Sequence, residues 1–308
     1  MVSEADRAKR PTRISVWLEG KPAGRGRRSE RSAARPTDPP TARPADPPTD
    51  RPTDPSAGHS KDPSARPSTA PSADPSPVPS TGQPAGLDRD RITAVSVRLL
   101  DAEGPAKFSM RRLAAELGVT AMSLYWYVDT KDDLLELALD SVFGEVQVPD
   151  LTDESADWRD QLRELAVSYR TVLVRHAWVS PLIGRYLNIG PHSTAFSAAV
   201  QSVMRRTGLA LHGQMGALSA VFQFVYGFGT IEGHFVQRSA DAGLSQDEYF
   251  RQAMGAISEQ PRFRTSFEDA DEIMTARGGD TVAEMRERDF TFALELLVAG
   301  IEAMRARG

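Results

Sequence analysis

A short segment in the first half of the chain carries side chains suited to contact nucleic acid. Arg111 has a planar guanidinium that can donate two hydrogen bonds to the O6 and N7 atoms of guanine. If residues 121–128 form a helix, with about 100° of rotation per residue, Met122 and Trp126 point away from Leu124. Tyr125 lies at the flank of the same surface. A small domain has little reason to expose such side chains unless they bind a partner. We therefore predict a DNA contact here; the alternative is a core position in a larger helical packing.

Lys131 is a second candidate for contact with DNA. It stands in the first turn of the next predicted helix, where a positive charge opposes the helix dipole. A phosphate partner explains this lysine better than a solvated surface position does. Arg112, in contrast, is expected to lie at the surface without reading bases.

Two short helices joined by a tight turn would hold these residues. Ser109 can cap a helix over residues 110–117, and Gly118 is suited to the left-handed position that ends it. Thr120 can cap a second helix over residues 121–128. This arrangement is a helix-turn-helix, whose second helix lies in the DNA major groove.

Residues 108–135 resemble the DNA-binding headpiece of tetracycline-repressor (TetR) family regulators. The sequence Leu-Tyr-Trp-Tyr-Val at 124–128, followed by Lys131 and Leu134-Leu135, is its most family-specific part. Three later segments are similar to the regulatory domain of that family: residues 157–162, 217–221 and 290–302. The resemblance therefore covers residues 87–308.

The resemblance implies roles for single residues of the headpiece. In the family, the residue matching Arg111 contacts a base, those matching 121–123 face base edges, and those matching 125–127 and Lys131 contact the DNA backbone or thymine methyl groups. Ala121 and Met122 differ from the tetracycline repressor itself, which leaves the operator sequence open. The predicted DNA-binding residues are Arg111, Thr120, Ala121, Met122, Ser123, Tyr125, Trp126, Tyr127 and Lys131.

An apolar region of the second half predicts a pocket for a small molecule. The predicted lining residues are Tyr169, His176, Tyr186, Ile189, Phe222 and Tyr226. Tetracycline repressors hold a drug–magnesium chelate through a histidine, an arginine and an asparagine, but Tyr186, Gly190 and Leu165 stand at what look like the matching places. We therefore expect a small apolar organic effector and neither a metal nor a cofactor.

Composition divides the chain into unequal parts. Of its 22 prolines, 17 precede residue 87, where near-repeats such as Arg35-Pro-Thr-Asp-Pro-Pro leave few apolar side chains to bury. We predict a basic arm of residues 1–30, a disordered linker of residues 31–86, a helix-turn-helix domain of residues 87–135, and a regulatory and dimerisation domain of residues 136–308.

The N-terminal arm has two features of its own. Residues 13–18 alternate apolar and polar side chains, which is typical of a short strand or a docking peptide, and we expect Trp17 to dock on the folded part. The basic cluster Gly24-Arg-Gly-Arg-Arg28 could enter a minor groove or neutralise phosphates. The alternative for this cluster is a solvated basic tail.

Composition also excludes several classes of protein. The chain has no cysteine, so disulfides, thiolate metal sites and a cysteine nucleophile are excluded. Its net charge of -5 argues against a sequence-blind nucleic-acid coat. No apolar run is long enough for a membrane span and no signal core is seen, so a cytoplasmic protein is expected. No nucleophile–base pair, carboxylate pair or phosphate-binding loop indicates an enzyme.

Helical spacing throughout the folded part predicts an all-α protein. The helices are expected at residues 88–100, ending before Gly104-Pro105, and then at 131–146, 158–176, 194–206, 212–237, 245–258 and 281–305. Leu294, Leu297, Val298 and Ile301 suit the seam of a homodimer, the alternative being burial within one protomer. The predicted function is a ligand-responsive, sequence-specific transcriptional regulator, a repressor released from operator DNA by a small organic molecule. The alternative is a constitutive architectural DNA-binding protein.

Overall fold

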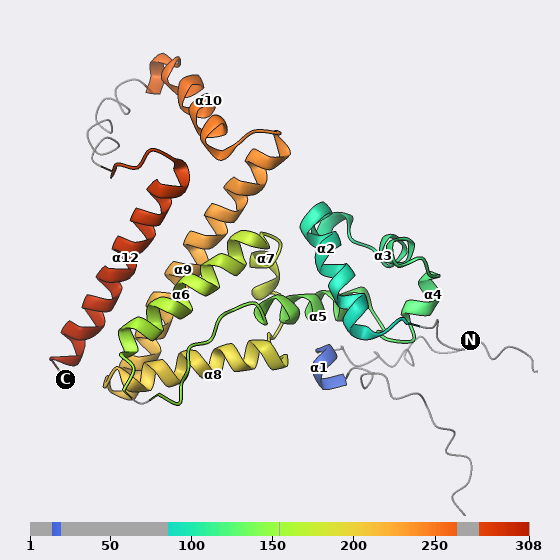
Figure 1. Ribbon diagram of the computed structural model, residues 1–308, viewed down its shortest axis with the longest axis horizontal. Coiled ribbons are helices and arrows are strands. Elements are labelled where there is room, and N and C mark those ends of the chain that lie inside the picture. Colours follow the sequence, from blue (N-terminus) through green and yellow to red (C-terminus); the bar gives the residue numbers. More distant parts are fainter. Residues whose placement is uncertain (1–13, 20–85, 154, 264–276, 308) are drawn as a thin grey trace, which may run out of the picture. The chain divides into compact units, whose positions relative to one another are not determined.

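The computed structural model describes residues 14–19, 86–153, 155–263 and 277–307. Every regular element in these ranges is helical, which confirms the all-α prediction (Figure 1). The elements are α1 (Val16–Glu19), α2 (Arg89–Lys107), α3 (Met110–Leu117), α4 (Ala121–Leu124), α5 (Lys131–Phe143), α6 (Trp158–Arg175), α7 (Ser180–Ile183), α8 (Pro191–Arg206), α9 (Leu211–Asp241), α10 (Gln246–Ser258), the 3₁₀ turn η1 (Pro261–Phe263) and α12 (Val282–Arg305).

The first long helix, α2, is kinked near its end. Asp88 caps its start by accepting a hydrogen bond from the Arg91 N–H at 2.7 Å. Gly104 has φ 72° and ψ 168°, a conformation that glycine adopts without steric cost, and Pro105 follows directly. The helix is therefore interrupted at the predicted Gly104-Pro105 break.

Helices α3 and α4 form the predicted helix-turn-helix. The Ser109 hydroxyl accepts a hydrogen bond from the Arg112 N–H at 3.2 Å, and Gly118, with φ 68°, ends α3. The Thr120 hydroxyl accepts from the Ser123 N–H at 3.3 Å and so fixes the start of α4. Each cap involves residues close in sequence, which explains why the turn could be located from sequence alone.

The second helix of this pair is shorter than the predicted range 121–128. Regular α-helix ends at Leu124, and the next amides donate to carbonyls three residues earlier. The Tyr127 side chain is only 5% exposed, and its hydroxyl donates to the Leu87 carbonyl at 2.5 Å. The α-helix therefore ends earlier than predicted, and the turns that follow it place the Tyr127 ring in the core of the headpiece.

Helix α5 connects the helix-turn-helix to the later helices, with contacts to α2 and to α8. Thr130 and Asp133 form a capping box at its start. Near its end, Asp140 Oδ1 accepts from the Ser193 N–H at 2.8 Å and thereby caps α8, whose own N-cap Gly190 has no side chain. A Cβ on Gly190 would lie 2.3 Å from this carboxylate, so the glycine permits the contact between α5 and α8.

Glycines of α9 allow that helix to approach α6 closely. A Cβ on Gly233 would lie 2.8 Å from the Leu173 carbonyl oxygen, closer than real contacts allow. In the same interface, the Arg170 guanidinium donates to the Glu232 carboxylate at 2.7 and 3.0 Å, and both side chains are largely buried. The two helices are thus joined by close backbone packing and a paired buried charge.

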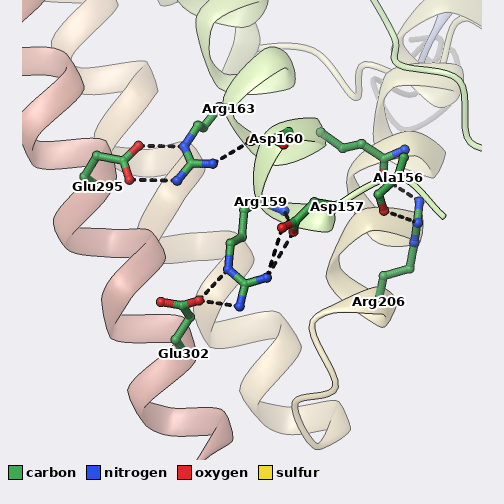
Figure 2. A network of polar contacts seen from close by, with 9 residues as sticks. Ala156, Asp157, Arg159, Asp160, Arg163, Arg206, Glu295 and Glu302 are labelled. Carbon is green, nitrogen blue, oxygen red and sulfur yellow. Dashed lines mark hydrogen bonds and ion pairs between the residues drawn. The ribbon is translucent and has the colours of Figure 1, made fainter. Parts of the chain in front are cut away.

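Helix α12 lies along α9 and is also tied to α6 (Figure 2). Arg163 donates to the two oxygens of Glu295 at 2.6 and 2.8 Å, and two nitrogens of Arg159 contact one oxygen, Oε1, of Glu302. Because these side chains are partly exposed, such pairs contribute little free energy of folding. The two arginines of α6 and the two glutamates of α12 can all pair in only one alignment of the helices, and the ion pairs therefore favour that alignment.

All the later predicted helices are present, and their ends differ by a few residues. Helix α8 begins earlier than expected because Pro191 suits a first helical position, and α9 extends to Asp241. Residues 16–19 form a helical turn, so the strand alternative for the N-terminal segment is wrong. The predictions for the linker of residues 31–86, apart from Gly86, and for Gly24–Arg28 lie outside the described residues. Among the described helices, none is long and apolar enough to cross a membrane.

Candidate DNA-reading surface and effector site

The helix-turn-helix presents a surface of large exposed side chains. Met122 is 72% exposed and Trp126 68% exposed, and Tyr125 is also exposed beside them. Leu124, on the opposite side of the same turn, is fully buried. The predicted division of this segment into a packed face and an exposed face is confirmed, and the core alternative for Met122 and Trp126 is wrong.

The two neighbouring arginines of α3 differ in their partners. Arg112 donates to Glu103 at 2.9 Å and to Glu116 at 2.9 Å, so its guanidinium is occupied within the headpiece. Arg111 is exposed, and no carboxylate in the described part of the chain pairs with it. Arg111 is therefore the arginine of α3 that is available to a base.

Two predicted DNA contacts have partners inside the protein. Tyr127 was predicted to contact DNA, but its side chain is buried and its hydroxyl is bonded to the Leu87 carbonyl. Its ring belongs to the core of the headpiece, so this prediction is corrected. The Lys131 ammonium donates to the Pro105 carbonyl at 3.2 Å and lies 5.6 Å from the centre of the Phe108 ring. Lys131 is half-buried, so its charge remains within reach of solvent at the end of α2.

Four aromatic rings from four helices meet in the second half of the chain. Tyr169 of α6 lies 5.2 Å from Phe196 of α8, and Phe196 lies 5.6 Å from Phe222 of α9, measured between ring centres. Phe143, the last residue of α5, lies 6.1 Å from Tyr169. Burial raises the pKa of Tyr169, and the nearby Tyr226 raises it further. We call these residues (Phe143, Tyr169, Phe196 and Phe222) the aromatic cluster.

The aromatic cluster contains two predicted pocket residues and two that were not predicted. Tyr169 and Phe222 were identified from their apolar surroundings in the sequence. Phe143 and Phe196 were missed because the sequence predicts their helices but not that these helices pack against each other. The signal that could have found them is an aromatic residue on the buried face of each helix.

The other four predicted pocket residues are not members of the aromatic cluster. The Tyr226 hydroxyl donates to the Ser180 carbonyl at 2.9 Å, and the Tyr186 hydroxyl donates to Asp132 Oδ1 at 2.9 Å. His176 lies where α2 approaches the end of α6. Ile189 is partly buried in the segment before α8.

His176 forms a polar junction between α2 and the later helices. Its Nδ1 lies 2.6 Å from Asp101 Oδ1, and the Trp178 indole N–H donates to the same oxygen at 2.6 Å. Its Nε2 lies 3.3 Å from Glu145 Oε2. Burial lowers the pKa of His176, but hydrogen bonds and charge from Asp101 and Glu145 outweigh this effect, so the pKa is raised. Sequence could not predict this junction because its members are distant in the chain.

An apolar groove runs between the start of α9 and the second half of α12. Its volume is about 620 Å³. Small residues of α9 and larger residues of α12 line it, among them Gly213, Gly216, Ala217, Leu296, Leu297 and Met304. Phe292, one turn before Leu296, is 68% exposed. Within the described residues, no group of three or more histidines and carboxylates could hold a metal ion.

Comparison with known proteins agrees with this geometry. Residues 92–138 match bacterial regulatory proteins of the tetR family, and residues 149–305 match the tetracyclin repressor-like C-terminal domain. An HTH-type transcriptional regulator from Saccharopolyspora erythraea is 33% identical over 217 residues, covering 70% of this chain and 85% of that protein. The HTH-type transcriptional repressor DrrR1 of Streptomyces coeruleorubidus is 29% identical over 227 residues, covering 73% and 81%.

A solved structure shows the same fold. The crystal structure of the TetR family protein ActR of Streptomyces coelicolor in complex with actinorhodin is 28% identical, with a TM-score of 0.55 over 71% of this chain and 98% of that one. The helix-turn-helix surface, the helical second half and both family matches lead to one conclusion. The chain belongs to the tetR family of bacterial regulatory proteins, and it is a helix-turn-helix DNA-binding regulator of transcription.

Proposed function

We propose that this protein is a repressor that binds its operator as a homodimer and leaves it when a small organic molecule enters the aromatic cluster. Helix α5 is the observation that carries the proposal. Its first turn follows the helix-turn-helix directly, and its last residue, Phe143, belongs to the aromatic cluster. A molecule inserted beside Phe143 displaces α5, and contacts of α5 with α2 transmit the displacement to the headpiece.

The chemistry of the aromatic cluster favours a largely apolar effector. We propose that Tyr169, Phe222 and Tyr226 contact the effector, together with Phe143 and Phe196. Aromatic rings with a few hydroxyl groups suit a flat organic molecule, and ActR was solved with actinorhodin bound.

A tetracycline–magnesium chelate is a poor fit to the same region. Leu165 is fully buried, and Gly190 is packed against Asp140. The nearby Glu232 carboxylate is already paired with Arg170. At the places that resemble the chelate's ligands, Tyr186, Gly190 and Leu165 offer no imidazole for the metal, and each buried polar group left unpaired costs about 1–3 kcal/mol.

For the DNA contact, we propose that Arg111 and residues 120–123 read base edges while Tyr125 and Trp126 contact the sugar–phosphate backbone. Lys131 contributes a phosphate contact at the edge of the same surface. Each headpiece spans one half-site, so two copies related by a two-fold axis read an inverted repeat.

The face formed by α9 and α12 is the proposed dimer interface. Its groove is apolar, and Phe292, Leu296 and Met304 are exposed there in the single protomer. Exposed apolar area of this extent on a monomer favours association. Pairing two such faces buries these residues and sets the distance between the two headpieces.

Selection of bound sequences from random duplex DNA tests the DNA-binding part of the proposal. The full chain should enrich an inverted repeat whose half-sites lie about one helical turn apart. Enrichment of no motif, combined with binding that depends only on salt concentration, would contradict the proposal and favour a sequence-blind architectural protein.

A further inference from the structure

The N-terminal segment of residues 14–18 is bound to the middle of α5. The Ser15 hydroxyl donates to Glu136 Oε2 at 2.5 Å, and the Val16 N–H donates to the same oxygen at 3.3 Å. Ser15 is 1% exposed and Val16 is also buried. Because Glu136 is itself buried, its carboxylate requires hydrogen bonds that the N-terminal segment supplies.

Trp17 of this segment lies where α5 meets the start of α8. It lines a small cleft with Leu139, Asp140 and Ser193, among others. Two buried oxygens of that cleft, Asn188 Oδ1 and Ser193 Oγ, have no hydrogen-bond partner among the described residues. Tryptophan offers a broad apolar ring with one N–H donor at its edge, which is the chemistry that such a cleft accommodates.

The sequence around this segment also indicates a docking peptide. Ile14, Val16, Trp17 and Leu18 stand together in a region that holds most of the chain's prolines and few other large apolar residues. The family matches cover residues 92–138 and 149–305, so the segment is an addition to the family fold. The addition contributes a defined contact on α5.

The N-terminal segment contacts α5 between two other connections of this helix. At the start of α5, Asp132 accepts a hydrogen bond from the Tyr186 hydroxyl. Near the end of α5, Asp140 caps the start of α8. The segment binds between these two connections, at Glu136. We propose that residues 14–18 are a tethered peptide ligand of α5, which holds this helix against the start of α8 and thereby sets the operator affinity of the headpiece. The effect on operator affinity rests on the function proposed above; the docking itself does not.

Hydrogen–deuterium exchange on the full chain tests the docking. The double variant Ser15→Ala/Trp17→Ala removes the hydroxyl donor and the indole, and Leu18→Ala is the matched control because Leu18 is exposed in the same segment. We expect the amides of α5 to exchange several-fold faster in the double variant and at the unchanged rate in the control. Equal exchange of α5 in all three proteins would overturn the docking.

Operator affinity of the same three proteins tests the regulatory effect. The probe is the duplex that the full chain selects from random DNA. The dissociation constant of the double variant should change by about fivefold or more, the lower range of a coupling between sites, while Leu18→Ala stays within about twofold of the unaltered chain. Faster exchange with unchanged affinity would overturn the regulatory role. Failure to select any duplex would instead remove the proposed function, and the exchange result would still decide the docking.

Discussion

At the scale of single residues, neighbouring side chains of one type acquire different roles through their partners. Arg112 is occupied by two glutamates, whereas Arg111 is exposed and has no carboxylate partner in the described ranges. Trp126 is exposed and Tyr127 beside it is buried with its hydroxyl paired. Residue type and spacing locate the surface, but the partners decide which side chain is available to DNA.

Substitution of Arg111 should therefore affect base discrimination. Arg111→Ala is expected to cost about 1–3 kcal/mol of operator binding and to relax the preference at one base position of each half-site. Competition binding with a panel of single-base operator variants measures this, and Arg112→Ala, which should leave the preference unchanged, is the control. A uniform loss across all duplexes would show that Arg111 contacts phosphate and not a base.

His176 gives the junction between α2 and the later helices a dependence on pH. Its folded-state pKa is raised, so its charged form contributes stability that is fully present below the ordinary histidine pKa of about 6.5. That contribution is lost as pH rises through the raised value. His176→Gln should therefore lower the melting temperature most at pH 6 and progressively less toward pH 9. Trp178→Phe, which removes a neutral donor to Asp101, should cost the same throughout; a parallel profile for both variants would contradict the assignment.

At the scale of elements, local signals were readable from sequence and distant contacts were not. Ser109, Gly118 and Thr120 cap helices through neighbours in the chain, so the helix-turn-helix could be predicted. Phe143 and Phe196 are in contact only because α5 and α8 pack together. No local sequence pattern predicts that packing. The sequence thus predicted which side chains of the helix-turn-helix are exposed, except Tyr127, and two of the four residues of the aromatic cluster.

The packing of α9 on α6 can be tested at its glycines. Gly233→Ala places a methyl group against the backbone of α6, which cannot move aside, and should lower the free energy of unfolding by about 1–3 kcal/mol. Gly227, on the same helix, has open space around its Cβ position. Gly227→Ala should raise stability by about 0.5–1 kcal/mol through helix propensity. Denaturant unfolding of both variants measures the difference, and equal effects would contradict the close packing of Gly233.

At the scale of the whole molecule, the proposed function requires two copies of the chain. Phe292→Glu together with Leu296→Glu places charges on the proposed interface and should convert the dimer into a monomer. Sedimentation measures the mass, and operator affinity should fall with the dimer because each headpiece then binds one half-site alone. The paired variant Arg262→Glu/Glu259→Arg, on an exposed part outside α9 and α12, should leave the dimer intact. A variant that stays dimeric with unchanged affinity would contradict this interface.

In the proposed function, an effector bound at the aromatic cluster releases the protein from its operator. The direct measurement is fluorescence anisotropy of the selected duplex bound to the full chain, during titration with flat, apolar aromatic compounds that raise the melting temperature of the protein. These compounds should release the duplex, and Phe196→Ala should raise the concentration needed, compared with the variant's own operator affinity in their absence. Tetracycline with magnesium should leave the duplex bound. If compounds that raise the melting temperature through the aromatic cluster leave the anisotropy unchanged, the coupling through α5 does not exist and the account is wrong.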